Sequence, residues 1–205
     1  MPSYKFSYFD LRGRGEPSRM LFAAAGIPFT DKRVTQEEFG KMKATDPYAS
    51  LPILEVTAGN DAYMMNQSMA INRHLARTFG LDGVTLNDKG MVDEIIENLV
   101  DVKSALFAVG FGDTEENREK LGKTLNKMCP KLEAQIQSNM KKGAGFAVGP
   151  KLTFADIFIF EAFESILSKM PDALNSYPGI KQNREKVAKL PKVADYVKKR
   201  KETPF

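Results

Sequence analysis

The sequence has few of the residues on which redox and metal proteins depend. Cys129 is the only cysteine among 205 residues. A single cysteine excludes an internal disulfide and any Cys-x-x-Cys redox or zinc motif. We therefore expect no redox chemistry carried by protein thiols.

Long hydrophobic runs are also missing. No stretch of about 18 apolar residues could span a bilayer, and the N-terminus passes directly into a strand pattern. It lacks the charged region, apolar core and cleavage site of a signal peptide. These absences predict a cytoplasmic protein that has no membrane partner.

The excess of one charge sign is small, because 30 Lys and Arg stand against 26 Asp and Glu, a net charge of +4. A clustered basic face is the usual footprint of nucleic-acid binding, but here the charges are mixed along the chain. The one dense cluster, residues 198–201, is typical of a solvated helix end, with a localisation signal as the alternative. The sequence thus predicts no nucleic-acid partner.

Hydrophobic residues make up 42% of the chain, enough for a substantial core. Alternation over residues 4–8 predicts a strand, and residues 16–25 have helical period and end before Gly26 as a C-cap. Further strands are expected at 27–34, 51–56 and 62–65, helices at 36–43 and 67–79, and a hairpin loop at 57–61.

Beyond a polar linker around residues 80–88, the pattern is helical throughout. Helices are expected at 91–111, 115–140, 154–169, 180–188 and 192–201. We therefore predict a small α/β domain, residues 1–82, followed by an all-helical domain, residues 83–205.

Thr153 and Asp156 have the spacing of a capping box. Thr153 can cap the helix that follows, and Asp156 can reach back to the backbone amide of the cap. We expect this pair to serve folding, because a capping box accounts for a carboxylate at this position; a catalytic acid is the alternative.

Tyr8 ends the first predicted strand beside the turn Gly13-Arg14-Gly15. The turn resembles part of a dinucleotide fingerprint, but Ser18 stands where the third glycine is needed, and the chain has no phosphate-loop motif. A tyrosine hydroxyl next to a guanidinium and a helix N-terminus can instead donate to an anion. The alternative interpretation is a core aromatic at strand period.

Two other short stretches each allow two interpretations. Pro52 opens a predicted strand; a cis bond there would turn backbone groups outward to pair with an extended peptide, and a trans proline at a strand edge is the alternative. Gln67 and Ser68 begin a predicted helix, whose free amides can bind a carboxylate, while simple capping by Asn66 or Ser68 is the alternative.

Taken together, these features resemble the cytosolic glutathione transferases, and within them the sigma class, especially its invertebrate and molluscan members. The resemblance covers essentially the whole chain. Its most specific parts are YFDLRGRGE at 8–16, LPILE at 51–55, QSMAI at 67–71, HLA at 74–76 and the capping box. The resemblance implies a thioredoxin-like N-terminal domain joined to an all-helical C-terminal domain in a homodimer, with a cis bond before Pro52.

The resemblance also implies site residues. Tyr8 hydrogen-bonds the glutathione sulfur, Arg14 packs against the Tyr8 ring, and Asp101 reaches the γ-glutamyl amine of the neighbouring subunit. The remaining glutathione contacts implied are Phe39, Lys43, Ser50, Leu51 and Pro52 for the glycyl and cysteinyl parts, and Gln67 and Ser68 for the γ-glutamyl carboxylate. We expect the electrophile pocket to include Phe9, Leu11, Phe158 and Phe205, each of which can equally be a core side chain.

The implied activity is conjugation of glutathione, the co-substrate, to hydrophobic electrophiles in detoxification. Two alternatives stay open. Some molluscan relatives are lens crystallins with little catalysis, and some sigma members isomerise prostaglandin endoperoxides to the D series. Phe39 also stands where sigma enzymes usually carry tryptophan, a residue that the chain lacks, so an indole hydrogen bond to glutathione is lost.

Overall fold

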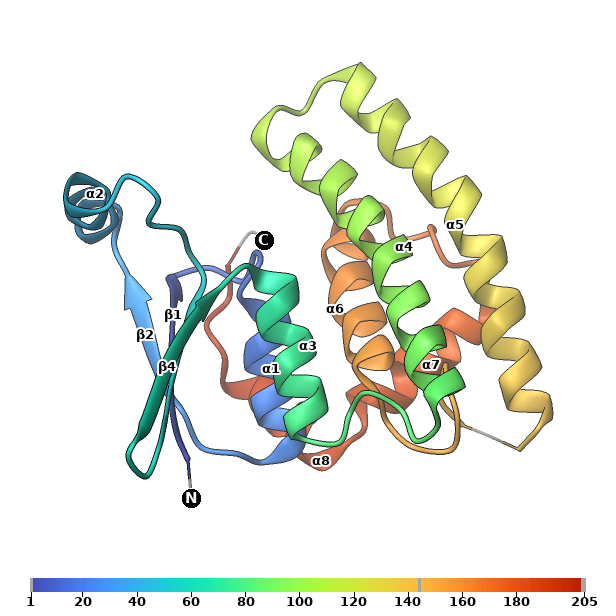
Figure 1. Ribbon diagram of the computed structural model, residues 1–205. Coiled ribbons are helices and arrows are strands. Elements are labelled where there is room, and N and C mark those ends of the chain that lie inside the picture. Colours follow the sequence, from blue (N-terminus) through green and yellow to red (C-terminus); the bar gives the residue numbers. More distant parts are fainter. Residues whose placement is uncertain (1, 144, 204–205) are drawn as a thin grey trace. The chain divides into compact units, whose positions relative to one another are not determined.

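The computed structural model describes residues 2–143 and 145–203 of the chain (Figure 1). The chain divides into two compact units. Unit 1 contains the residues up to Phe79 together with those from Pro191 onward, and unit 2 is Gly80–Leu190. The C-terminal helix therefore belongs with the N-terminal sheet.

Unit 1 is built on a four-stranded mixed sheet of order β2-β1-β3-β4. Its strands are β1 (Ser3–Phe9), β2 (Thr30–Val34), β3 (Ile53–Ala58) and β4 (Asp61–Asn66). β1 and β2 are parallel and the other pairs antiparallel. The helices are α1 (Glu16–Ala25), α2 (Gln36–Thr45), α3 (Ser68–Thr78) and α8 (Pro191–Lys199). This order and topology define a thioredoxin-like domain.

Helices cover one face of this sheet. α1 packs against both α3 and α8, and Figure 1 shows α1 and α3 side by side. The ring of Phe22 on α1 lies 5.3 Å from that of Tyr4 on β1 and 5.4 Å from that of Phe79, between ring centroids. The alternation that predicted β1 thus becomes a buried aromatic row beneath α1.

Proline sets where two of the strands begin. β2 starts at Thr30 instead of residue 27, and β3 starts at Ile53 instead of residue 51. Pro28 and Pro52 have no N–H to give to a sheet ladder, so pairing begins only after them. The β3–β4 turn is tighter than the expected loop, because Ala58 already pairs with Asp61 and Gly59 takes a φ of +63°.

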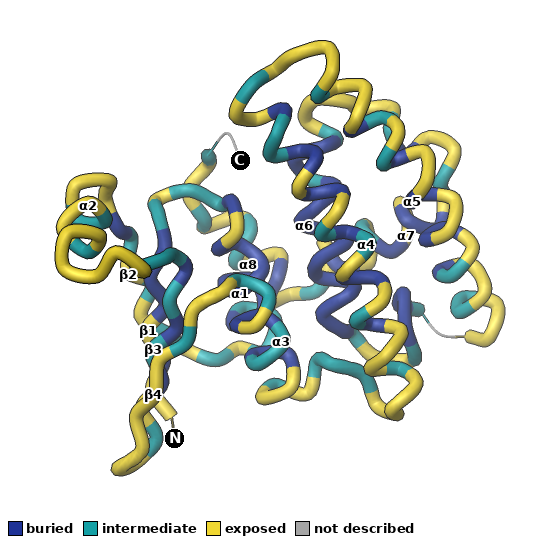
Figure 2. The backbone as a smooth tube through the Cα atoms, turned by 45° about the horizontal axis from the view of Figure 1, so that its top comes forward, coloured by how far each residue is buried: buried dark blue, intermediate teal, exposed yellow. Residues whose placement is uncertain are grey.

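Unit 2 is helical, with α4 (Leu86–Phe111), α5 (Glu115–Lys141), α6 (Phe154–Lys169) and α7 (Pro178–Ala188). α4 packs on α5 and α6, and α7 packs on the same two helices. α6 is buried along most of its length, as Figure 2 shows. α4 begins five residues before the expected position, because Thr85 and Asp88 form a capping box ahead of its first turn.

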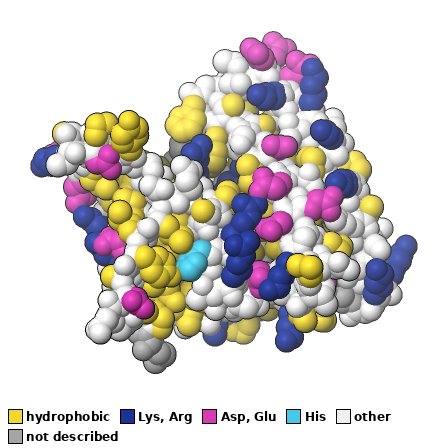
Figure 3. Space-filling model, in the orientation of Figure 1, with side chains coloured by type: hydrophobic (Ala, Val, Ile, Leu, Met, Phe, Trp, Pro, Cys, Tyr) yellow, Lys and Arg dark blue, Asp and Glu magenta, His cyan; other side chains and the backbone are white. Residues whose placement is uncertain are grey.

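Charges of both signs are spread over the surface. Acidic and basic side chains are interspersed on the face drawn in Figure 3. Within the basic cluster at 198–201, Lys199 pairs with Asp195, while Arg200 pairs with Glu16 and Lys201 with Asp10. In the described ranges, no helix has the length and apolar character that crossing a bilayer requires.

Candidate active site

Tyr8 lies near the end of β1, and its side chain is 7% exposed. Its hydroxyl oxygen accepts a hydrogen bond of 3.1 Å from the backbone N–H of Arg14, in the turn before α1. Because a phenol both accepts and donates, this bond orients the hydroxyl without consuming its proton. The backbone of the turn therefore sets the direction of the Tyr8 O–H.

Glycine allows the turn to approach the Tyr8 ring this closely. A Cβ atom at Gly15 would lie 2.5 Å from Cδ1 of Tyr8, and one at Gly13 would lie 2.9 Å from the Tyr8 hydroxyl oxygen. Gly13 also has a φ of +43°, which other residues rarely adopt. The two glycines thus let the turn lie against Tyr8.

The arginine buried beside Tyr8 is Arg19, on α1. Its side chain is fully buried, and its guanidinium carbon lies 5.8 Å from the centroid of the Tyr8 ring. It donates to the carbonyls of Leu11 at 2.8 Å and Phe9 at 3.3 Å, and its Nε lies 3.1 Å from the Asp31 carboxylate. Arg19 therefore fixes the backbone directly after Tyr8.

Sequence reasoning missed Arg19. The signal was available: Arg19 stands three residues before Phe22, so it shares the buried face of α1, where an arginine requires a partner. Arg14, which the resemblance places against the Tyr8 ring, is an exposed residue whose backbone amide donates to the Tyr8 hydroxyl.

The strand register brings three predicted site segments to one end of the sheet. Ile53 pairs with Ser7 on one side and with Asn66 on the other. One residue beyond that row lie Tyr8, Pro52 and Gln67. Neighbouring strands are about 4.8 Å apart, so the span from β1 to β4 is about 10 Å, the length of an extended tripeptide.

Pro52 and Gln67 have unusual backbones at this edge. The Leu51–Pro52 bond is cis, as the resemblance predicts, and Pro52 is buried while Ser50 and Leu51 are half-buried. Gln67 has a φ of +72°, and no other non-glycine residue in the described ranges has a positive φ. A bulky residue held there points to a functional constraint.

Gln67 occupies the N-cap position of α3, and its side chain makes no capping hydrogen bond. The N-cap is thus Gln67 itself, and its side chain leaves the amides of the first turn of α3 uncapped. The amides of the first turn of α3 face the same sheet end as Tyr8, and a helix N-terminus attracts a carboxylate.

Phe39 and Lys43 lie on α2 at the neighbouring strand end. The Phe39 ring lies 5.3 Å from that of Phe9, which ends β1, and Lys43 Nζ lies 5.8 Å from the Phe39 centroid. Lys43 also donates to the carbonyl of Pro47 at 3.0 Å. Leu11 is half-buried in the turn after β1. Phe39 on α2 thus contacts Phe9 at the end of β1, and Lys43 lies beside Phe39.

The predicted residues of unit 2 have different surroundings. Phe158 on α6 is 2% exposed and packs on Phe154 at 5.4 Å between centroids, with Lys103 Nζ 5.5 Å from its ring. Asp101 is exposed on α4. Phe205 lies outside the described residues.

Asp156 is fully buried and accepts hydrogen bonds from the Thr153 backbone at 2.8 Å, the Thr153 hydroxyl at 2.8 Å, the Ala147 backbone at 2.7 Å and the Asn183 amide at 2.7 Å. Burial raises the pKa of Asp156, and these hydrogen bonds oppose that rise. The capping-box interpretation is confirmed, and the carboxylate additionally ties α6 to α7.

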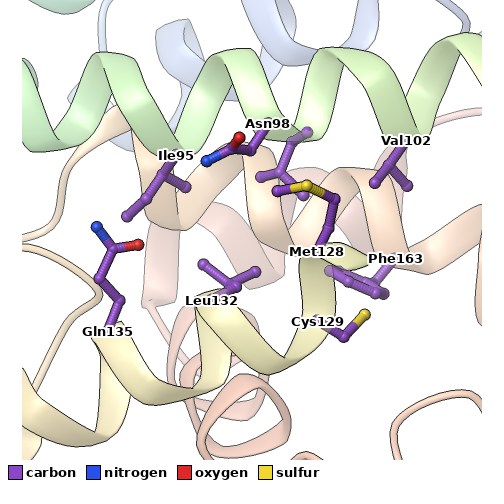
Figure 4. Close-up of a pocket in the computed structure, with 9 residues that line it drawn as sticks. Ile95, Asn98, Val102, Met128, Cys129, Leu132, Gln135 and Phe163 are labelled. Carbon is purple, nitrogen blue, oxygen red and sulfur yellow. The ribbon is translucent and has the colours of Figure 1, made fainter. Parts of the chain in front are cut away.

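A small pocket between α4, α5 and α6 contains the single cysteine (Figure 4). Its walls are mostly apolar, with Ile95, Leu132 and Phe163 around Cys129. Burial raises the pKa of the Cys129 thiol to about 12, so it stays protonated and unreactive near neutral pH. Among the described residues, no group of acidic, histidine or cysteine side chains is arranged to hold a metal ion.

A thioredoxin-like sheet with a buried tyrosine and a cis-proline, followed by a helical unit, is the architecture that the sequence resemblance implies. The family model "Glutathione S-transferase, C-terminal domain" matches residues 100–200. The chain is 36% identical to Glutathione S-transferase 1 of Ascaris suum, with each chain covered in full. It belongs to the glutathione S-transferase family.

Two other relatives extend this assignment. The chain is 35% identical to S-crystallin SL11 of Nototodarus sloanii, again over all of both chains. Among solved structures, the sigma class enzyme of Fasciola hepatica matches with a TM-score of 0.88 and 26% identity, over 100% of this chain and 99% of that one. The predicted fold, a thioredoxin-like domain followed by helices, is confirmed.

Proposed function

We propose that this chain conjugates the thiol of glutathione to hydrophobic electrophiles, with Tyr8 as the catalytic group. The observation that carries the proposal is the Tyr8 hydroxyl, which the Arg14 amide orients at 3.1 Å on the sheet end that it shares with Pro52 and Gln67. Glutathione is then the co-substrate, and no metal takes part.

The sheet end suggests how glutathione lies. Its γ-glutamyl carboxylate meets the amides of Gln67 and Ser68 at the N-terminus of α3. Its cysteinyl backbone pairs with Ser50, Leu51 and Pro52 before β3, and its glycyl end points toward Phe39 and Lys43 on α2. The spacing of about 10 Å across three strands suits a tripeptide in this direction.

Tyr8 then lies at the cysteinyl sulfur. A free thiol with a pKa of about 8.5 is only a few per cent thiolate at neutral pH, and each unit of lowering is worth about 1.4 kcal/mol in favour of the anion. A neutral phenol that donates to the sulfur, beside the N-terminus of α1, stabilises the thiolate. The thiol proton passes to solvent, and the sulfur attacks the electrophile with no protein nucleophile.

Several finer assignments belong to this proposal. Residues 1–82 form the glutathione-binding domain, and residues 83–205 form the helical domain that carries the electrophile site. The residues expected to line that site are Phe9, Leu11, Phe158 and Phe205. The chain is of the sigma class, which the sigma class structure from Fasciola supports. It works in the cytoplasm as a homodimer, in which Asp101 of one subunit meets the γ-glutamyl amine bound to the other.

Retention on immobilised glutathione, followed by turnover of aryl halides, hydroperoxides and a prostaglandin endoperoxide, tests the proposal. We expect retention and measurable conjugation. Retention with negligible turnover of every electrophile would favour the structural role suggested by the S-crystallin relative. Turnover of the endoperoxide alone would favour the isomerase alternative, and a protein that passes unretained would contradict glutathione binding altogether.

A further inference from the structure

The C-terminal segment of unit 1 lies against the turn that follows Tyr8. The Tyr196 hydroxyl donates to the Glu16 carboxylate, lying 3.1 Å from each oxygen, and Nη1 of Arg200 lies 2.8 Å from Oε1 of the same carboxylate. Glu16 is the first residue of α1 and is 1% exposed. The buried Glu16 carboxylate at the start of α1 is thus bound by Tyr196 on α8 and by Arg200, which directly follows α8.

Two further contacts join the same segments. Thr203 accepts two hydrogen bonds from Arg12. The Arg12 backbone N–H donates to the Thr203 hydroxyl at 3.2 Å, and the Arg12 guanidinium donates to the Thr203 carbonyl at 2.9 Å. Lys201 pairs with Asp10. Residues 196–203 therefore hold the chain at positions 10, 12 and 16, on both sides of Gly13-Arg14-Gly15.

The segment anchored in this way, residues 10–16, contains the Arg14 amide that orients the Tyr8 hydroxyl. The Arg12 carbonyl accepts from the amides of Gly15 at 3.1 Å and Glu16 at 2.9 Å, so the turn is closed between the two anchored residues. Gly15 is the N-cap of α1 and has no side chain to cap it. A shift of Arg12 or Glu16 therefore moves the Arg14 amide away from the Tyr8 hydroxyl.

We propose that Tyr196, Arg200 and Thr203 are positioning residues for Tyr8, acting through the Gly13-Arg14-Gly15 turn. This inference rests on the proposed function of Tyr8. The hydrogen bond from the Arg14 amide polarises the phenol and makes its O–H a better donor to sulfur. Arg200 adds a second effect, because the buried Glu16 carboxylate opposes a nearby thiolate, and Arg200 at 2.8 Å offsets its charge more closely than Arg19, whose Nη1 lies 3.9 Å from it.

The mildest test is Tyr196→Phe, which removes one hydroxyl and keeps the ring. We expect the bound glutathione thiol to gain about half a pKa unit, which lowers the thiolate fraction about three-fold below that pKa. Thr203→Val should act in the same direction, Arg200→Gln should act more strongly, and Arg200→Lys should restore part of the loss. The measurements are thiolate absorbance of the binary complex against pH and the pH profile of kcat/KM.

Lys199→Gln is the matched control, because Lys199 lies next to Arg200 but pairs with Asp195 in solvent. It should leave the thiol pKa unchanged. Thermal melts show that each variant is folded at the assay temperature. If folded Tyr196→Phe, Thr203→Val and Arg200→Gln proteins all keep the wild-type thiol pKa, the inference is wrong, whatever their stability.

Tyr8→Phe, titrated alongside, separates this inference from the proposed function. A raised thiol pKa in Tyr8→Phe, with no change in Tyr196→Phe, Thr203→Val or Arg200→Gln, overturns the inference alone. An unchanged thiol pKa in Tyr8→Phe overturns the role of Tyr8 itself. A rise in all four variants, largest for Tyr8→Phe, is the expected result.

Discussion

Asp156 accepts four hydrogen bonds, although capping its own helix uses only the Thr153 groups. The additional donors come from Ala147 and from Asn183 on α7. If the acceptor is removed, each buried donor loses its hydrogen-bond partner, and the cost of removing that donor from water is no longer compensated. Asp156 therefore stabilises unit 2 beyond the capping of α6.

Asp156→Ala should lower the free energy of unfolding by more than about 2 kcal/mol, because several buried donors lose their partner. Asp88→Ala is the matched control, since Asp88 completes the same kind of capping box at α4 near the surface, and it should cost about 0.5 to 2 kcal/mol. Chemical denaturation measures both, and activity per folded molecule should stay constant. A collapse of that activity at unchanged stability would instead assign Asp156 to the chemistry.

Gly15→Ala places a methyl group 2.5 Å from the Tyr8 ring. Because the ring or the turn must move, we expect kcat/KM for glutathione conjugation to fall about ten-fold or more. Gly122→Ala on α5 is the control, since nothing lies within 4 Å of its added methyl group. That change should preserve activity and stabilise the helix by about 0.5 to 1 kcal/mol. Full activity in Gly15→Ala would show that the close approach is unnecessary.

At the scale of elements, one carboxylate of α5 organises the start of α7. Glu133 is 8% exposed and accepts from the backbone amides of Gly179 at 2.7 Å and Ile180 at 2.9 Å. A helix N-terminus offers its unpaired amides and the positive end of its dipole to such an anion. Glu133 thus serves as a cap supplied by another helix.

Glu133→Gln keeps the size of the side chain but removes the charge and one acceptor. The free energy of unfolding should fall by about 1 to 3 kcal/mol, because buried donors at α7 lose a charged partner. Glu119→Gln on the same helix breaks only an exposed pair with Lys123 and should change stability by less than about 0.5 kcal/mol. Equal losses in the two variants, measured by urea unfolding, would contradict the cap.

Element order could be predicted from the sequence because periodicity is a local signal. α1 and α6 have the predicted bounds, and Gly26 ends α1 in a left-handed conformation as expected of a C-cap. Three misplaced starts lie where a single residue overrides periodicity: β2 begins after Pro28, β3 after Pro52 and α4 after Thr85. Each of those could have been read from known proline and capping chemistry.

At the scale of the whole molecule, we expect the site to be shared between two subunits through Asp101. Asp101 is exposed on α4 in the single chain, eight residues after Asp93 and four after Glu97. An acidic stripe of this kind is also what a solvated helix face carries. Thermodynamic comparison within the stripe separates the two interpretations.

Asp101→Asn should weaken glutathione binding by about 1.5 kcal/mol or more, the usual value of a charge-assisted hydrogen bond to an ammonium. Glu97→Gln, one turn away, should have a far smaller effect. Isothermal titration gives both affinities, and sedimentation gives the oligomeric state. Equal small losses, or a fully active monomer, would contradict the shared site.

The parts of the site that sequence reasoning missed are the long-range ones. Tyr8, Pro52 and Gln67 carry local signals, since each stands at a strand end or a helix start. Arg19 contacts Phe9, Leu11 and Asp31 only because α1 packs on β1 and β2. Arg200 meets Glu16 across 184 residues of chain, and no periodicity records such a contact. Only the three-dimensional structure shows that residues 196–203 contact the chain on both sides of the Gly13-Arg14-Gly15 turn.

The pKa of the glutathione thiol bound to wild-type protein and to Tyr8→Phe is the most direct measure of the central claim. Ultraviolet titration of each binary complex, at saturating glutathione, reports the thiolate directly. The account predicts a wild-type value clearly below the ordinary thiol pKa of about 8.5 and a rise of about one unit or more in Tyr8→Phe, with at least a ten-fold loss of turnover. Equal thiol pKa values in the two proteins, or undiminished turnover in the variant, would contradict it.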